Sequence, residues 1–114
     1  SNLNEIVTRA LQFGAQRILL PTSHPVPDVG SFDFKNLSYE SNRREYSAIV
    51  RDVAQKTGAV LVDIEKRFDL AIAQDAVLDD FLMSDGMHLS LKGHDFYAEI
   101  FWPILREQIK RLKD

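Results

Sequence analysis

Asp85 and His88 are the residues of this chain whose types and spacing best fit a chemical role. They stand three positions apart in an Asp-Gly-Met-His segment, so in a loop or a first helical turn the carboxylate can reach the nearer ring nitrogen of the imidazole. Such a carboxylate fixes the tautomer of the histidine and stabilises the imidazolium that forms when the histidine accepts a proton from a serine. The pair is therefore a candidate general base with its orienting aspartate. The structural alternative is an aspartate that caps a turn beside a histidine bonded to backbone.

The sequence does not show which serine this base would activate. Ser84 shares a backbone segment with the pair and is badly placed to lose a proton to His88. Ser23 follows an expected strand, at the edge where open α/β sheets bind ligands, but nothing around it resembles a strained nucleophile elbow. Ser90 is expected to cap a helix. His24 is a candidate substrate-binding residue because it shares the position of Ser23, and a surface histidine before a proline is the alternative.

A metal site is a further interpretation of the same segment. His88 and His94 lie six positions apart, with Asp85 and Asp95 nearby, and imidazole and carboxylate groups are common metal ligands. No tight pair of the His-x-x-x-His kind is present. The sequence therefore favours the general base over a metal centre.

At these residues the chain resembles the C-terminal end of the SGNH hydrolases, also called the GDSL esterase/lipase family. The last block of that family reads as an aspartate, two residues, a histidine and then a glycine before the final helix. Asp85, His88 and Gly93 match it position by position. The other blocks, a Gly-Asp-Ser segment with the nucleophile and a Gly-x-Asn-Asp segment whose asparagine completes the oxyanion hole, are absent. Gly93 is expected to allow close packing of the last helix.

The resemblance implies ester hydrolysis through an acyl-enzyme. A serine from outside this sequence would attack the carbonyl, His88 would carry the proton, and Asp85 would orient His88. It implies no cofactor, and ester substrates that range in this family from lipids and thioesters to acetylated sugars. The chain alone is expected to be inactive. Two alternatives stay open: a non-catalytic α/β module that binds a partner, and a degenerate family member that has lost its serine.

Composition limits the remaining classes. The chain has 114 residues, of which 45% are hydrophobic and 27% charged, which suits one small domain. Its net charge of -3 gives no basic surface for nucleic acid. Its longest apolar runs fall far short of the roughly 20 residues that span a bilayer. There is no cysteine, so neither a disulfide framework nor a thiolate nucleophile exists, and the cellular compartment stays undetermined.

Helical and strand patterns alternate along the chain. Apolar periodicity and turn residues predict a helix over 3–11, a strand over 17–21, a loop over 22–39, a helix over 41–57, a strand over 59–64, a partly amphipathic segment over 66–82 and a helix over 95–112. Gly14 and Gly58 are expected to stop the first two helices. Pro103 should kink or split the last helix near Trp102, because proline lacks the amide hydrogen and clashes with the preceding turn.

The apolar residues at helical spacing predict which faces are buried. In the second helix these are Tyr46, Ile49, Val50, Val53 and Ala54, and in the last helix they are Tyr97, Ile100, Phe101, Ile104, Leu105, Ile109 and Leu112. The loop residues Phe32, Phe34, Leu37 and Tyr39 are expected either to pack into the core or to contact an acyl or sugar group.

Strand, helix and strand in this order predict a βαβ unit with a parallel sheet and therefore an α/β fold. With the resemblance, this is expected to be part of a three-layer α/β/α flavodoxin-like fold, of which residues 1–114 would form the C-terminal portion of a single domain. Two parallel strands cannot bury both of their edges. We therefore expect either the missing N-terminal half or a self-associated copy as a partner.

Overall fold

A computed structural model describes residues 2–29 and 38–113. The elements follow one another as helix α1 (Asn2–Gln12), strand β1 (Leu19–Pro21), helix α2 (Tyr39–Thr57), strand β2 (Val60–Val62), helix α3 (Ile64–Ala73), the 3-10 helix η1 (Leu78–Phe81) and helix α4 (Leu91–Lys110). Within these ranges no helix combines the length and the hydropathy that a bilayer crossing demands.

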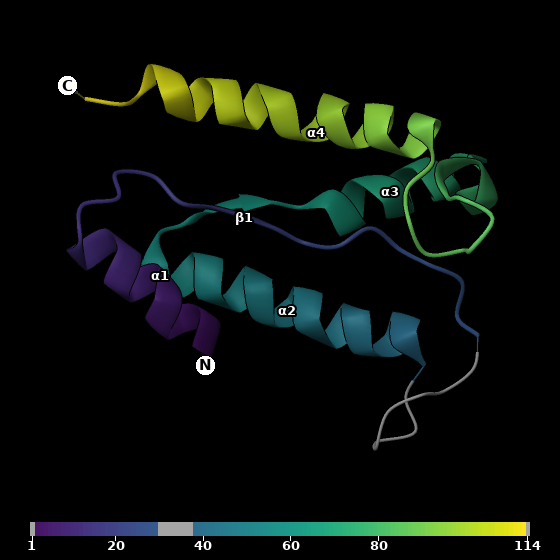
Figure 1. Cartoon of the computed structure of the whole chain (residues 1–114), viewed down its shortest axis with the longest axis horizontal. Coiled ribbons are helices and arrows are strands. Elements are labelled where there is room, and N and C mark those ends of the chain that lie inside the picture. The colour runs from purple at the N-terminus through teal and green to yellow at the C-terminus, as the bar shows by residue number, and fades with distance from the viewer. Residues whose placement is uncertain (1, 30–37, 114) are drawn as a thin grey trace.

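Strands β1 and β2 form a parallel sheet in which Leu19 pairs with Val60, Leu20 with Leu61 and Pro21 with Val62. Helix α2 makes the crossover between them and packs on both strands, while α4 packs against β2. Figure 1 shows α4 above the strands and α1 with α2 below them, which makes three layers. The predicted α/β fold with a parallel βαβ unit is confirmed.

Short polar side chains and glycine fix the ends of the helices. Ser38 caps α2 by accepting a hydrogen bond from the Ser41 amide, and Ser90 caps α4 by accepting one from the Gly93 amide. Gly58 ends α2 with a left-handed φ of 77°, a conformation that glycine adopts without a steric penalty. The predicted roles of Gly58 and Ser90 are confirmed.

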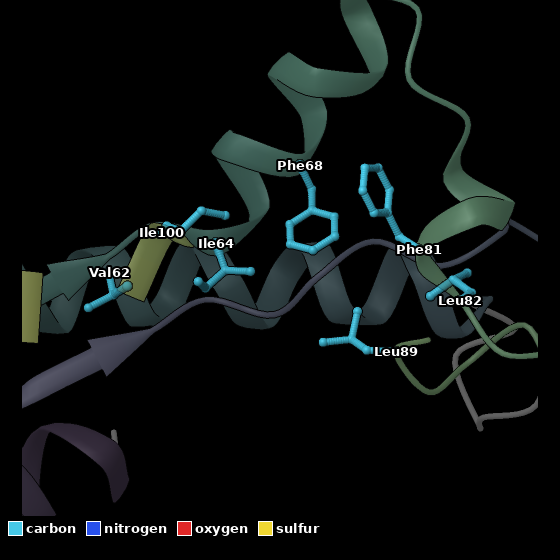
Figure 2. Packing of buried hydrophobic residues seen from close by; sticks show 7 residues of the cluster. All are labelled: Val62, Ile64, Phe68, Phe81, Leu82, Leu89 and Ile100. Atoms are coloured by element: carbon cyan, nitrogen blue, oxygen red, sulfur yellow. The ribbon is translucent and has the colours of Figure 1, made fainter. Parts of the chain in front are cut away.

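The hydrophobic core lies between β2, α3, η1 and the start of α4, and Figure 2 shows its side chains converging. Phe68 is fully buried near its centre, with ring centroids 5.2 Å from Phe81 and 4.8 Å from Phe96. The other buried members of this cluster are Val62, Ile64, Leu82, Leu89 and Ile100. This cluster joins the segments on both sides of the Asp85 loop.

Helix α2 buries a different face from the predicted one. Val50, Val53 and Ala54 are buried as expected, whereas Tyr46 is 60% exposed and Ile49 is 42% exposed. Polar residues take their places, because the buried face of the first half of the helix carries Glu40, Arg43 and Ser47. The loop after β1 meets them with polar groups, because the Ser23 amide donates to the Ser47 hydroxyl and the Ser23 carbonyl accepts from Arg43, and an apolar side chain could not satisfy these groups.

Helix α4 also differs from its predicted form. It begins at Leu91, directly after the Ser90 cap, and it continues through Pro103 without a split. Pro103 and Glu99, whose carbonyl loses its helical hydrogen bond to the proline, are both exposed, so water can take that bond. Near the end of the chain Ile109 and Leu112 are each 50% exposed, contrary to the prediction.

The strands are shorter than predicted, and Ile64 opens α3 because Asp63 caps that helix. Residues 66–82 contain most of α3, a connecting turn over 74–77 and then η1. The predicted positions of Phe32, Phe34 and Leu37 lie outside the described residues. Tyr39 begins α2 and is 40% exposed, so it is not a core residue.

Candidate active site

Asp85 and His88 lie in a short hairpin between η1 and α4. Leu82 and Leu89 form an antiparallel bridge at its base, and the Met83 amide donates to the His88 carbonyl at 2.8 Å. Inside the hairpin the Gly86 amide donates to the Met83 carbonyl at 2.9 Å, and Gly86 has a left-handed φ of 68°. The backbone of the hairpin is thus closed by its own hydrogen bonds.

The two side chains meet in the arrangement that a general base requires. Nδ1 of His88 lies 2.6 Å from Oδ2 of Asp85, while Oδ1 of Asp85 accepts hydrogen bonds from the Met87 and His88 amides at 2.9 and 3.0 Å. The bond from His88, followed by the two backbone bonds, lowers the pKa of Asp85 to about 2. An ionised Asp85 favours the His88 tautomer with the proton on Nδ1. Nε2 is then the basic nitrogen, on a side chain that is 73% exposed.

The end of the hairpin is fixed to η1 by Ser90 and Gly93. The Ser90 amide donates to the Phe81 carbonyl at 2.9 Å, and its hydroxyl donates to the Asp80 carbonyl at 2.8 Å. A Cβ atom at Gly93 would lie 2.1 Å from the Phe81 carbonyl oxygen, which is far inside van der Waals contact. Glycine at this position therefore permits the close approach of α4 to η1, as the sequence predicted.

His24 lies in the loop after β1, on the same side of the molecule as the hairpin. It lines a pocket of about 250 Å³ that is also lined by Met87, the neighbour of His88. Its Nδ1 lies 3.0 Å from the Pro25 carbonyl, and burial lowers its pKa below the ordinary 6.5. His24 is therefore neutral at pH 7, with the proton on Nδ1.

A buried arginine holds the His24 loop in place. Nη1 of Arg43 donates to the Ser23 carbonyl at 2.8 Å and to Glu65 at 2.6 Å, and its other nitrogens donate to both carboxylate oxygens of Glu40. Glu40 in turn accepts a hydrogen bond from the Val26 amide at 3.4 Å. The loop is thus bonded to the side chains of α2 on both sides of His24.

A second arginine extends this network toward the sheet. Arg51 donates to both oxygens of Asp63 and to Glu65, each at 2.9 Å, and this lowers the pKa of Asp63. The Thr22 hydroxyl donates to Asp63 at 3.0 Å and accepts from the Glu65 amide at 2.9 Å. The ends of both strands are therefore connected through charged side chains.

Sequence reasoning missed this network. The sequence did contain a sign of it. Glu40, Arg43 and Ser47 are three or four positions apart and lie on the same face of α2 as Val50 and Ala54. The predicted buried face contained only apolar residues and left out these three positions, which are all buried.

The sequence profile of the GDSL-like Lipase/Acylhydrolase family matches residues 1–96, which include the hairpin and the whole network. The chain belongs to this family. A human protein named Isoamyl acetate-hydrolyzing esterase 1 homolog is 31% identical over 68 residues, which cover 60% of this chain. The match spans a quarter of the length of that protein. No solved structure matches the chain.

The described part of this GDSL-like protein pairs no serine with its candidate base. Asp85 is the side chain that is hydrogen-bonded to His88 there, and Ser23 is linked instead to Ser47, whose hydroxyl accepts from the Ser23 amide at 3.4 Å. Ser84 is exposed within the hairpin. In the same residues no three histidine, aspartate or glutamate side chains gather as metal ligands, so the alternative metal grouping of His88 with His94 does not form.

Proposed function

We propose that this chain supplies the base of a serine esterase, in which His88 is the general base and acid and Asp85 orients it. The 2.6 Å contact between Nδ1 of His88 and Oδ2 of Asp85 carries the proposal. Membership of the GDSL-like Lipase/Acylhydrolase family supports the hydrolase class. The name of the human relative supports a carboxylic ester as the substrate.

The chemistry follows from the protonation states of the pair. Nε2 of His88 accepts the proton of a serine hydroxyl as the serine attacks the ester carbonyl, and it then returns this proton to the leaving alcohol. Water then attacks the acyl-enzyme and gives a proton to Nε2 of His88, which returns it to the serine oxygen as the acyl–serine bond breaks and the carboxylic acid is released. Because the pKa of Asp85 is about 2, Asp85 remains a carboxylate throughout and stabilises the imidazolium in both steps.

The serine and the oxyanion donors of this mechanism come from outside the present sequence. We infer that residues 1–114 form the C-terminal part of the domain and associate with the remaining part or with a second copy. A two-stranded sheet supports this inference because independently stable sheets generally have three or more strands. Size-exclusion chromatography tests it, and a compact 13.0 kDa monomer with native-like stability would contradict it.

Hydrolysis of p-nitrophenyl acetate tests the catalytic assignment. The parent protein that contains this sequence is compared with its His88→Ala and Asp85→Asn variants, and His94→Ala is the matched control because His94 is an exposed histidine of α4. We expect His88→Ala to lower kcat by about 10³-fold or more and Asp85→Asn to impair it through the wrong tautomer. The control should keep its activity.

Three results would separate the alternatives. Full turnover in the His88→Ala parent would remove the assignment of the base. Turnover by the isolated chain would show that it carries its own nucleophile. An inactive parent with an intact fold would support a non-catalytic module or a degenerate family member.

A further inference from the structure

The location and the lining residues of the pocket beside the hairpin suit the binding of one part of a substrate. It lies between the loop after β1, the start of α2 and the hairpin, and its volume is about 250 Å³. Met87 lines it and directly precedes His88, so a group bound in this pocket would sit next to the candidate base.

The apolar part of the lining comes from five different segments. Pro21 ends β1, Val26 belongs to the loop after it, Tyr39 opens α2, Met87 lies in the hairpin and Tyr97 lies on α4. Burying a methylene group against such side chains contributes about 0.8 kcal/mol. A volume of about 250 Å³ holds about eight groups the size of a water molecule, which occupies about 30 Å³. The pocket is therefore large enough for a short aliphatic chain but not for a long one.

The charged residue in this lining is already neutralised. Arg43 is 7% exposed, and its guanidinium donates to Glu40, to Glu65 and to the Ser23 carbonyl. His24 is neutral at pH 7 because burial lowers its pKa. An anionic ligand would find no uncompensated cation among these residues and would lose its hydration.

We propose that this pocket is the subsite for a short, uncharged aliphatic group of the ester, with up to about eight non-hydrogen atoms. The proposal rests on the proposed function for the identity of the ligand as part of an ester. The same aliphatic chemistry is found in acyl chains and in alcohol chains, and the pocket selects both by size and by lack of charge.

The two methionines of the chain make a direct test possible. Met83 and Met87 lie in the same hairpin and are 55% and 42% exposed, but Met87 lines the pocket. The chain is labelled with ¹³C in its methionine methyl groups and is titrated with the ketones 2-butanone to 2-heptanone, which resemble esters but cannot be hydrolysed. Hexanoate serves as the charged probe, and Ser23→Trp, at an exposed lining position, serves as the blocking variant.

We expect a saturable shift of the Met87 signal with little change at Met83. The affinity should rise about fourfold for each added methylene group up to 2-heptanone and should rise no further for 2-octanone and 2-nonanone, which extend the series. The response should disappear in the Ser23→Trp chain, and hexanoate should bind more weakly than 2-hexanone. Equal shifts at the two methionines, no saturation at Met87, or tighter binding of hexanoate would each overturn the proposal.

The titration is independent of catalysis, so the two proposals can fail separately. A selective Met87 response together with an inactive parent protein would support the pocket and refute the esterase. In the parent, a series of p-nitrophenyl acyl esters and a series of alkyl acetates would then show which chain of the ester the pocket accepts. Esterase turnover that is unaffected by Ser23→Trp, with no Met87 response, would overturn the pocket and leave the esterase standing.

Discussion

Gly93→Ala is the substitution whose effect the structure predicts most sharply, because two contributions of opposite sign compete. Replacing glycine by alanine in an unhindered helix stabilises it by up to about 1 kcal/mol. At Gly93, however, the new Cβ would lie 2.1 Å from the Phe81 carbonyl oxygen and 3.0 Å from a methyl carbon of Leu89. Ordinary carbon–oxygen contacts begin at about 3.3 Å, so α4 and η1 would have to separate by about 1 Å.

The cost of that separation exceeds the gain in helix propensity. Overpacking a tight contact typically costs about 1–3 kcal/mol. The movement also stretches the bond from the Ser90 amide to the Phe81 carbonyl, now 2.9 Å, and such a bond contributes about 1 kcal/mol. After subtraction of the helix term, we expect Gly93→Ala to lower the free energy of unfolding by about 1–3 kcal/mol. For a chain of this length that corresponds to a fall in Tm of about 4–12 °C.

Thermal and urea unfolding followed by circular dichroism measure this effect. Ala98→Gly calibrates the helix term, since Ala98 is an exposed residue of the same helix and its replacement should cost about 1 kcal/mol. If Gly93→Ala raised Tm by the amount that Ala98→Gly lowers it, the close approach of α4 to η1 would be refuted. A destabilised variant should also lose esterase activity in the parent protein, because Phe81 and Ser90 anchor the hairpin with His88.

Further predictions concern the charges and the core. Arg43→Met should destabilise the protein by up to about 3–5 kcal/mol because it removes the buried partner that Glu40 and Glu65 share and leaves these carboxylates only the more exposed Arg44 and Arg51. Arg44→Met, at a side chain that is 42% exposed, should cost no more than about 1 kcal/mol, and urea unfolding of both variants checks the contrast. Phe68→Ala should cost about 3–5 kcal/mol in the same assay, since the ring is fully buried. Carboxyl NMR should find the Asp85 pKa at about 2 and, in the His88→Ala variant, closer to the ordinary 3.8. Since folding lowers this pKa, the stability that Asp85 contributes is present above about pH 4 and is lost as the pH falls through 2.

The sequence predicted those features that depend on near neighbours. The hydrogen bond between Asp85 and His88 joins residues three positions apart, and the caps at Ser90 and Gly58 act on the adjacent turn. The parallel βαβ unit was equally accessible, since two apolar runs flank one amphipathic helix. The catalytic role of Asp85 and His88 remains a prediction.

The buried face of α2 was not accessible in this way. Arg43 can be buried because it donates a hydrogen bond to Glu65, which lies 22 positions away in the sequence. No local sequence pattern predicts such a contact. The apolar residues Tyr46 and Ile49 indicated a face rotated away from the observed one, because periodicity assumes that the sheet presents an apolar surface to the whole helix. Here the first half of α2 meets the polar ends of the strands, where charged partners stabilise it.

The hairpin with Asp85 and His88 has a consequence for how this domain can change over evolution. Its closing contacts, from the bridge of Leu82 and Leu89 to the amide bonds of Asp85, all join residues within eight consecutive positions. Insertions, deletions or substitutions elsewhere in the chain can therefore alter the surroundings of the pair without altering its internal geometry. A lineage could then exchange the surrounding loops while it inherits the same Asp85–His88 pair unchanged.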